Sequence, residues 1–335
     1  MHGVSFLKEM DDTDRKLMLL IYEDPRMHLR ELARRLGITR QAVHHRMRVL
    51  TKAGVFRTIK AAISNYYLDG VPVAVWGKSN AASAEETFES LGGSEFTTCV
   101  RVAGGNDLFV AGYLRDISEL SSYVEFVKKA AEMPEPTVGI LCVGDGINPL
   151  SFDGGMRKQS HKELSPIDLK IIASLQDDAR KPIAEIADAV GVSAKTVRCH
   201  LEAMRREGSL DFDSPWDVPS GEDMVTMIYV NLRRGADKVK VARRLLSIDR
   251  IHIMYMRQFS NLPCLLLGLI YSNKMTEIRK ILGAIEDDED VLSVTPNLIY
   301  FERLYPAWDY RQTAAYQDPS KTFRKHHARH GRITR

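Results

Sequence analysis

The sequence contains few cysteines and none of the spacings that metal or redox sites require. Its four cysteines, Cys99, Cys142, Cys199 and Cys264, are far apart, and no Cys-x-x-Cys pair occurs in the 335 residues. Isolated cysteines of this kind are typical of buried, reduced thiols. We therefore expect free thiols, no metal site and no cofactor.

Long hydrophobic stretches and a secretion signal are also missing. No apolar run approaches the roughly 18 residues that a membrane-spanning helix needs. Residues 1–12 contain neither an apolar segment nor a small-residue cleavage site, so nothing marks the chain for secretion. With 44% hydrophobic and 27% charged residues, the composition is typical of globular proteins. We expect a cytoplasmic protein without a membrane partner.

Catalytic signatures lack a supporting context anywhere in the chain. There is no Ser/His/Asp set, no phosphate-binding P-loop and no Gly-x-Gly-x-x-Gly turn between a strand and a helix. The net charge of +3 is small but unevenly distributed. Residues 1–69 hold 13 Lys and Arg against 8 Asp and Glu, and residues 306–335 hold 7 against 2. The positive charge is therefore concentrated at the two ends, and an ordinary enzyme is not expected.

The chain repeats itself at an offset of 154 residues. The identical pairs include Asp14 and Asp168, Lys16 and Lys170, Glu31 and Glu185, Ala33 and Ala187, Gly37 and Gly191, Val43 and Val197, and Gly54 and Gly208. Solenoid repeats are only about 20 to 50 residues long. The longer period indicates the duplication of a whole pair of domains.

The first part of each copy has apolar residues at helical spacing. In the first copy they are Leu17, Leu20, Ile21, Leu29, Leu32, Ala33 and Leu36. Thr39 and Ser193 follow short glycine turns, at the position where a helix needs an N-cap. Gly54 and Gly208 then supply C-terminal glycines. This pattern predicts three short helices per copy, in the order found in helix-turn-helix domains.

The second part of each copy changes to the period of strands. The predicted elements are strands at Val71–Lys78, Phe96–Ala103 and Leu108–Leu114 with a helix at Ala81–Leu91, and strands at Met224–Arg233, Ile251–Phe259 and Cys264–Tyr271 with a helix at Ala236–Leu246. A helix and a closing strand complete each copy. The order is that of a ferredoxin-like βαββαβ domain, whose helices cover only one face of its sheet. The other face must be covered by something else.

The sequence therefore predicts an α+β fold in which two winged helix-turn-helix domains alternate with two ferredoxin-like βαββαβ sandwich domains. Six segments are expected, because 335 residues exceed the usual size of one domain. They are a winged helix-turn-helix at 1–64, a ferredoxin-like domain at 65–150, a linker at 151–164, a second winged helix-turn-helix at 165–218, a second ferredoxin-like domain at 219–308 and a basic tail at 309–335.

The second helix of the first helix-turn-helix carries side chains suited to reading DNA. This helix lies in the major groove in such motifs, so its exposed face should offer hydrogen-bond donors to bases and phosphates. The candidate residues are Thr39, Arg40, Gln41, His44, His45 and Arg48, with Arg57 and Lys60 on the expected wing. No acidic residue occurs from Thr39 to Lys52. The alternative is a three-helix module that binds another protein and has a solvated basic face. The unopposed positive charge, the helix caps and the turn glycine together favour double-stranded DNA as the partner.

The second helix-turn-helix is less basic. Residues 165–215 hold 7 Lys and Arg against 9 Asp and Glu. Its candidate DNA contacts are Ser193, Lys195, Thr196 and Arg198. Two interpretations stay open: a weaker contact with DNA, or a role in assembly.

Together these parts resemble the Lrp/AsnC family of regulators, twice over. The residues that carry the resemblance are Asp14 with Lys16, Glu31-Leu32-Ala33, Leu36-Gly37-Ile38, Val43 with Leu50, Gly54-Val55 and Val102-Ala103-Gly104-Gly105-Asn106-Asp107. The resemblance implies RAM-type sandwich domains that pair through their sheets, and an amino-acid effector near the Gly-x-x-Asp loop. It also implies a sequence-specific transcription regulator whose DNA binding or assembly responds to that effector.

The candidate effector contacts are therefore Gly104, Gly105, Asn106 and Asp107. Taken alone, such a loop is typical of a tight strand connection, because Gly and Asn tolerate positive φ. Bare backbone N–H groups can also hold a carboxylate, and an aspartate can accept from an ammonium group. The corresponding loop Ser260–Pro263 lacks both glycine and aspartate, which indicates one sensing half and one altered half.

Duplication lets one chain form internally the dimer that single-unit family members make from two chains. If the second helix-turn-helix reads DNA poorly, two chains are still needed to place two strong readers on a pseudo-palindromic site. We therefore expect a homo-oligomer.

Two further interpretations concern an enzyme and the tail. Sirohaem decarboxylases resemble the same paired architecture, and Arg101, His252, Tyr255 and Arg257 could contribute to a tetrapyrrole site. The basic helix and the Gly104–Asp107 loop favour the regulator.

The tail at 309–335 is rich in Lys, Arg and His and is expected to be disordered. Two roles stay open for it: binding DNA phosphates, or keeping the chain in solution.

Overall fold

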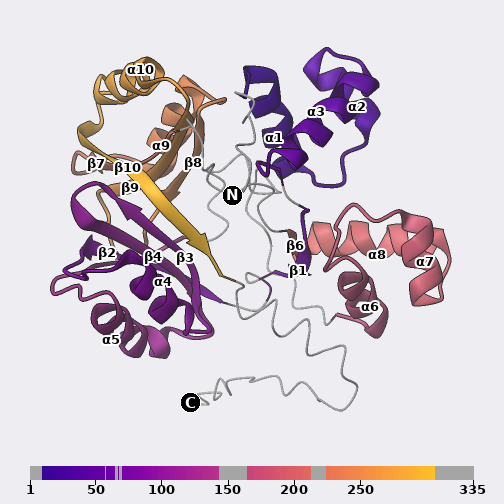
Figure 1. Cartoon of the computed structure of the whole chain (residues 1–335), viewed down its shortest axis with the longest axis horizontal. Helices are drawn as coiled ribbons and strands as arrows, with labels where there is room; N and C mark the ends of the chain where they lie inside the picture. Colours follow the sequence, from indigo (N-terminus) through magenta and orange to yellow (C-terminus); the bar gives the residue numbers. More distant parts are fainter. Residues whose placement is uncertain are drawn as a thin grey trace, which may run out of the picture.

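The computed structural model describes residues 10–56, 58–64, 67, 70–142, 164–212 and 224–305. It confirms the predicted α+β fold class, with two helix-turn-helix units beside a large sheet (Figure 1). Almost all of the predicted linker at 151–164 and all of the tail at 309–335 lie outside the described residues. The domain limits therefore stay predictions.

The first helix-turn-helix unit consists of α1 (Asp12–Glu23), α2 (Leu29–Leu36) and α3 (Arg40–Lys52), followed by strand β1 (Ala61–Ile63). α1 begins at a reciprocal capping box in which the side chains of Asp11 and Asp14 each accept a backbone N–H of the other residue. Leu17, Leu32 and Val43, one from each helix, are fully buried. The apolar residues read from the sequence therefore form the core that fixes the three helices.

The second unit repeats this arrangement with α6 (Pro166–Ser174), α7 (Ile183–Val190) and α8 (Ala194–Glu207), followed by strand β6 (Leu210–Phe212). α6 begins at a second capping box, made by Ser165 and Asp168, with proline in the first turn. Both units are thus started by caps at the same relative position, which the 154-residue offset predicts.

The first sandwich domain follows the predicted order. Its elements are β2 (Val71–Lys78), α4 (Ala84–Gly92), β3 (Thr97–Ala103), η1 (Gly104–Asn106), β4 (Asp107–Leu114), η2 (Ile117–Glu119), α5 (Leu120–Ala130) and β5 (Thr137–Ile140). The second has β7 (Met224–Leu232), α9 (Lys238–Ile248), β8 (Ile253–Gln258), β9 (Leu265–Ser272), α10 (Met275–Glu286) and β10 (Val291–Leu304). Apolar clusters join α4 and α5 to the first set of strands and α9 and α10 to the second. The helices therefore cover one face of each half-sheet.

The two half-sheets form one antiparallel sheet in the order β5-β2-β4-β3-β10-β7-β9-β8. β3 pairs with β10 across the junction of the halves. The outer edges also meet, because Leu141 bridges to Phe259 and the N–H of Cys142 donates to Gln258 O at 2.9 Å. Such closure satisfies edge strands that would otherwise expose unpaired backbone groups.

The open faces of the half-sheets cover each other. The Trp76 ring of the first half stacks on Tyr229 and Phe259 of the second, with centroids 5.6 and 5.3 Å apart. A Cβ at Gly139 would lie 2.4 Å from the Phe259 ring, so only glycine fits this position. Stacked aromatic pairs contribute about 0.5 to 1.5 kcal/mol each beyond their buried area. The helix-free faces of the two half-sheets, which the sequence left without a cover, are thus buried against each other within one chain.

A second contact between the halves joins the helix-turn-helix units. Strand β1 pairs antiparallel with β6, with Ala61 opposite Phe212. Arg26 donates to Ala179 O and to Lys181 O (2.9 Å), and Arg180 donates to Pro25 O and to Met27 O (3.0 Å). The two arginines occupy matched positions at the 154-residue offset. Their contacts therefore give the pair of units an approximate twofold symmetry.

The expectation of buried thiols holds for Cys99 alone, because Cys142 and Cys264 are partly exposed and Cys199 is exposed. All four cysteines are free, and Cys99 is buried, whereas Cys199 is exposed on α8. Cys199 follows Arg198 on the surface of the second reading helix, where no core contact is required. Among the described residues, no helix has the length and hydropathy to cross a membrane, and no three potential metal ligands gather.

Candidate nucleic-acid interface

The turn between α2 and α3 has the geometry that a helix-turn-helix requires. α2 ends at Gly37, whose φ of 68° lies in the left-handed region that favours glycine. Thr39 caps α3, its side chain accepting the N–H of Ala42 at 3.1 Å. In the second unit, Gly191 has a φ of 77° and Ser193 caps α8 in the same way. The predicted roles of Thr39 and Ser193 as caps agree with this geometry.

The predicted reading residues of α3 lie on its exposed face. Those that are exposed are Arg40, Gln41, His44, His45 and Arg48, while Val43 and Leu50 are buried. Arg40 and Arg48 form no ion pair within the part of the chain that the structure describes. Their guanidinium groups are therefore available to a ligand such as a phosphate or a guanine edge.

Arg46 has a different role from its neighbours. Its Nη1 atom lies 2.8 Å from Asp11 Oδ2 and 2.7 Å from Asp14 Oδ1, and its side chain is largely covered. The hydrogen bond that Arg46 donates to Asp14 raises the pKa of Arg46, although burial opposes this shift, so Arg46 stays charged beside the acids at the start of α1. This pair fixes the reading helix to α1.

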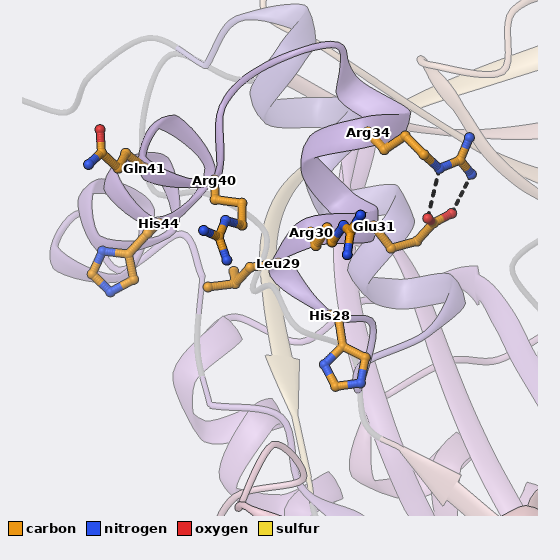
Figure 2. Close-up of a pocket in the computed structure, with 8 residues that line it drawn as sticks. All are labelled: His28, Leu29, Arg30, Glu31, Arg34, Arg40, Gln41 and His44. Atoms are coloured by element: carbon orange, nitrogen blue, oxygen red, sulfur yellow. Dashed lines mark hydrogen bonds and ion pairs between the residues drawn. The ribbon is translucent and has the colours of Figure 1, made fainter.

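An open pocket of about 1050 Å³ lies between α2 and α3 (Figure 2). Its lining contains the predicted Arg40, Gln41 and His44, and also His28, Leu29, Arg30, Glu31 and Arg34. His28, Arg30 and Arg34 were not among the predicted contacts, because the predicted contacts lie on the second helix of the motif and the expected wing. The i, i+4 spacing of Arg30 and Arg34 on one helix face was the available signal.

Charge in this pocket is only partly compensated. Arg34 and Arg35 donate to the Glu31 carboxylate, and these hydrogen bonds lower the pKa of Glu31 to about 2. Glu31 is therefore ionised at neutral pH and offsets one of the two arginines. Arg30 and Arg40 face the same pocket without an ion pair to any described residue, which leaves the α2–α3 surface positive.

The strand after α3 does not form a wing within its own unit among the described residues. The sequence analysis placed Arg57 and Lys60 on such a wing. Lys60 is exposed directly before β1, but β1 pairs with β6 of the other unit, and Arg57 lies outside the described residues. In the described residues, β1 is therefore used for pairing between the units.

The candidate contacts of the second unit are partly engaged with each other. Lys195 and Arg198 are exposed, whereas the Thr196 hydroxyl lies 2.8 Å from the Ser193 hydroxyl. The α7 surface beside them exposes Glu185 and Asp188. The second unit therefore does not gather the cationic side chains that surround the pocket of the first.

The Gly104–Asp107 loop forms a tight connection between β3 and β4. Gly105 and Asn106 have φ values of 67° and 61°, as a short turn of this kind requires. Lys78 Nζ donates to Gly105 O at 3.3 Å, and Asp107 pairs with Lys78 in the ladder. Burial, followed by the negative charge of Asp107, raises the pKa of Tyr229 in the second half. The loop thus lies close to the junction between the halves.

The four residues considered for a tetrapyrrole site do not form one cationic cluster. Arg101 forms a buried ion pair with Glu302 and a hydrogen bond to Tyr255 (3.2 Å), and Arg257 lies over the Tyr255 ring. His252 instead lies between Asp249 and Glu277. Arg101 is neutralised and the histidine is surrounded by acids, so the set does not suit propionate groups.

Comparison with known proteins supports the helix-turn-helix assignment in both units. Residues 10–57 match the family described as winged helix-turn-helix DNA-binding, and residues 164–205 match the AsnC-type helix-turn-helix domain. The chain is 29% identical over 119 residues to an uncharacterised HTH-type transcriptional regulator of Pyrococcus horikoshii, covering 35% of this chain and 75% of that one. It is 32% identical over 90 residues to the regulatory protein AsnC of Haemophilus influenzae, covering 26% and 60%.

A solved structure resembles the chain over almost its whole length. The sirohaem decarboxylase NirDL superposes with a TM-score of 0.56 at 14% identity, covering 91% of this chain and 99% of that one. At this identity the likeness concerns the fold alone. It shows that the arrangement of two helix-turn-helix units and two joined half-sheets occurs in another protein.

Proposed function

We propose that this chain, a regulator of the Lrp/AsnC family with two helix-turn-helix domains, reads a specific DNA sequence through the first of them. The observation that carries the proposal is the exposed α3 face, where Arg40, Gln41, His44 and Arg48 point away from the core. Arginine and glutamine at such positions can pair with guanine and adenine edges in the major groove. The α2 residues beside them suit the phosphate backbone.

The test is binding of the purified chain to the DNA upstream of its own gene, measured by fluorescence anisotropy across a salt series with excess nonspecific competitor. Selective binding that weakens as salt rises is expected, because phosphate contacts release counterions. A scrambled fragment of equal length is the control. Equal affinity for both fragments at every salt concentration would exclude sequence-specific reading.

We further propose that an amino acid binds near Gly104–Asp107 and changes DNA binding or assembly. The family resemblance and two features of the loop support this: Gly105 and Asn106 are exposed, and Asp107 is half-buried beside the junction of the halves. Adding single amino acids to the DNA-binding assay should identify one that shifts the affinity. Asp107→Asn should abolish that shift while leaving DNA binding without effector intact; a shift that persists would move the site elsewhere.

A homo-oligomer is the third part of the proposal. The chain contains its own paired sandwich but only one strongly basic reading surface, so two chains are needed to read two half-sites. Sedimentation with and without DNA should give at least two chains per duplex carrying a palindromic site. One chain per duplex would restrict reading to a single half-site.

The likeness to a decarboxylase fold leaves one alternative to test. The matched families and curated relatives are helix-turn-helix regulators, and the Arg101, His252, Tyr255 and Arg257 set does not gather into a tetrapyrrole site. A purified protein that shows a haem-like Soret absorption after incubation with an iron tetrapyrrole, and lacks selective DNA binding, would favour the enzyme.

A further inference from the structure

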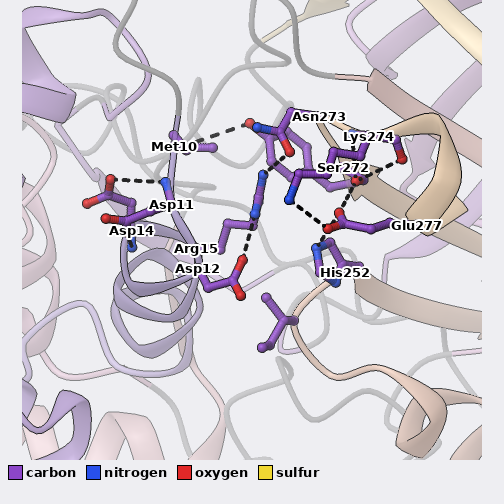
Figure 3. Close-up of polar contacts among 12 residues, drawn as sticks. Met10, Asp11, Asp12, Asp14, Arg15, His252, Ser272, Asn273, Lys274 and Glu277 are labelled. Carbon is purple, nitrogen blue, oxygen red and sulfur yellow. Dashed lines mark hydrogen bonds and ion pairs between the residues drawn. The ribbon is translucent and has the colours of Figure 1, made fainter.

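α1 of the first helix-turn-helix unit is attached to the second sandwich domain by a buried arginine (Figure 3). Arg15 is only 4% exposed, and its Nη2 atom donates to Asn273 Oδ1 at 2.8 Å, while its Nη1 atom donates to Asp12 Oδ1 at 2.8 Å. Its guanidinium lies over the Tyr271 ring, 6.0 Å from the centroid. We call the contact of Arg15 with Tyr271 and Asn273 the Arg15 interface.

The far side of the Arg15 interface is a hydrogen-bonded turn between β9 and α10. Glu277 on α10 holds this turn, because it accepts from the Ser272 hydroxyl (2.5 Å) and from Lys274 Nζ (3.1 Å). His252 Nε2 lies 3.1 Å from the same carboxylate. The hydrogen bond with Ser272 lowers the pKa of Glu277, so this group is an anion around neutral pH. Asn273 is thus presented to Arg15 from a fixed position.

The near side of the interface leads directly to the reading helix. Asp11 and Asp14 belong to the same first turn of α1 as Arg15, and both bind Arg46 in the middle of α3. One helix turn therefore holds α3 through its acids and the second sandwich domain through its arginine. Movement of the β9–α10 turn would be transmitted to α3 through these contacts.

The second unit retains the contact between its first and third helices but not the contact with a sandwich domain that Arg15 makes. At the 154-residue offset, Asp168 matches Asp14 and His200 matches Arg46, and their side chains still meet at 2.7 Å. The position of Arg15 is taken by Leu169, which cannot donate a hydrogen bond. The Arg15 attachment to a sandwich domain therefore has no equivalent at the matched position of the second unit.

We infer that Arg15 is a positioning residue for DNA reading, which couples the orientation of α3 to the second sandwich domain without touching DNA. The inference rests on the proposed function of the first unit. It differs from a direct contact in one measurable respect: each lost phosphate contact lowers the slope of affinity against salt by about 0.9, whereas loss of a positioning contact leaves the slope unchanged.

The experiment compares Arg15→Lys and Asn273→Ala with the wild type, using the fragment upstream of the gene as probe. Lysine keeps the charge but lacks the forked donors that reach Asp12 and Asn273 together. Both variants should bind about three- to tenfold more weakly, with an unchanged salt slope, and the double variant should be no weaker than either single one. Lys16→Ala, which removes an exposed charge from the same helix, is the matched control and should bind like the wild type.

Hydrogen exchange provides a readout that does not depend on DNA. Amide exchange in the first turns of α1 should be about tenfold faster in Asn273→Ala than in the wild type, while the sandwich core stays protected. Wild-type affinity in both variants, a salt slope reduced by about one, or unchanged α1 exchange would overturn the inference. A wild type that lacks selective DNA binding would contradict the proposed function instead, and hydrogen exchange would still decide whether the Arg15 interface holds α1.

Discussion

The two helix-turn-helix units share a framework and differ in the surface that meets a ligand. Both have a left-handed glycine in the turn and a hydroxyl cap on the reading helix. At the 154-residue offset the exposed positions have diverged: Arg30 is matched by Ala184, Arg34 by Asp188, Arg40 by Ala194 and Arg48 by Glu202. The comparison teaches that the fold constrains caps, turn and core, whereas the charge of the outer face is free to change with function.

The same comparison extends to how each unit is held. Both units have an arginine in the contact between them, Arg26 in the first and Arg180 in the second, and each donates to backbone carbonyls of the other unit. The contact between the units is therefore symmetric. The attachment through Arg15 is present in one unit only. These contacts favour assembly over DNA reading as the role of the second unit, and four predictions test this division of roles.

The largest expected effect is on DNA affinity and separates the two reading helices. Replacing Arg40 and Arg48 together with alanine should weaken selective binding by about 2 to 6 kcal/mol, since each bidentate base contact contributes about 1 to 3 kcal/mol. The matched change in the second unit, Lys195→Ala with Arg198→Ala, should cost much less. Anisotropy titrations of both double variants on one fragment measure the difference. Equal losses would make the two units equivalent readers.

The next effect concerns stability and tests the symmetry between the units. Arg26→Ala and Arg180→Ala each remove two hydrogen bonds from a half-buried cation to backbone carbonyls. A hydrogen bond to a charged group contributes about 1.5 to 3 kcal/mol, so the loss of two should lower the free energy of unfolding by at least about 1.5 kcal/mol in each variant. Urea denaturation monitored by circular dichroism is the measurement. A large loss in only one of the two variants would show that the contact is not symmetric.

Much of this architecture was accessible from the sequence because its signals are local. Apolar periodicity, caps and turn glycines predicted the helices, and α4 was expected at Ala81–Leu91 and begins three residues later. The 154-residue offset predicted the second copy. Exposure of Arg40, Gln41, His44 and Arg48 follows from helical geometry, because Val43 and Leu50 form the buried face of the same helix.

Contacts between distant segments could not be predicted in the same way. The pairing of β1 with β6 replaced the expected wing, and Arg15 meets a partner 258 residues away. Neither contact follows from periodicity, because both depend on how the two copies dock. A signal for Arg26 did exist: Asp24 and Arg26 recur as Asp178 and Arg180 at the same offset, and the identity of charged residues in a loop indicates a shared contact.

A smaller effect is expected for α2, where the two units differ most in charge. Arg30→Ala should weaken binding a few-fold on selective and scrambled fragments alike, and should lower the salt slope by about 0.9, if Arg30 meets one phosphate. Ala184→Arg, the reverse change at the matched position, should raise affinity only if the second unit also lies on DNA. Salt titrations of both variants give the slopes. An unchanged slope in Arg30→Ala would place α2 away from the backbone.

The smallest expected effect is on stability and depends on pH. It concerns α6, the helix of the second unit that corresponds to α1. Burial would raise the pKa of Asp168, but hydrogen bonds from Ser165 and His200 outweigh it, so the pKa lies below the ordinary value of 3.8. A depressed carboxyl pKa contributes stability that is fully present above the unfolded-state value and is lost as pH falls through the folded-state value. Asp168→Asn should therefore be less stable than the wild type at pH 7 by about 0.5 kcal/mol, the low end for helix caps, since asparagine keeps an acceptor oxygen. That difference should shrink below pH 4 in chemical denaturation curves.

Asp177→Asn, which removes an exposed charge from the same unit, is the control. A difference in stability between wild type and Asp168→Asn that stays constant from pH 7 to 3 would refute the ionic role of Asp168.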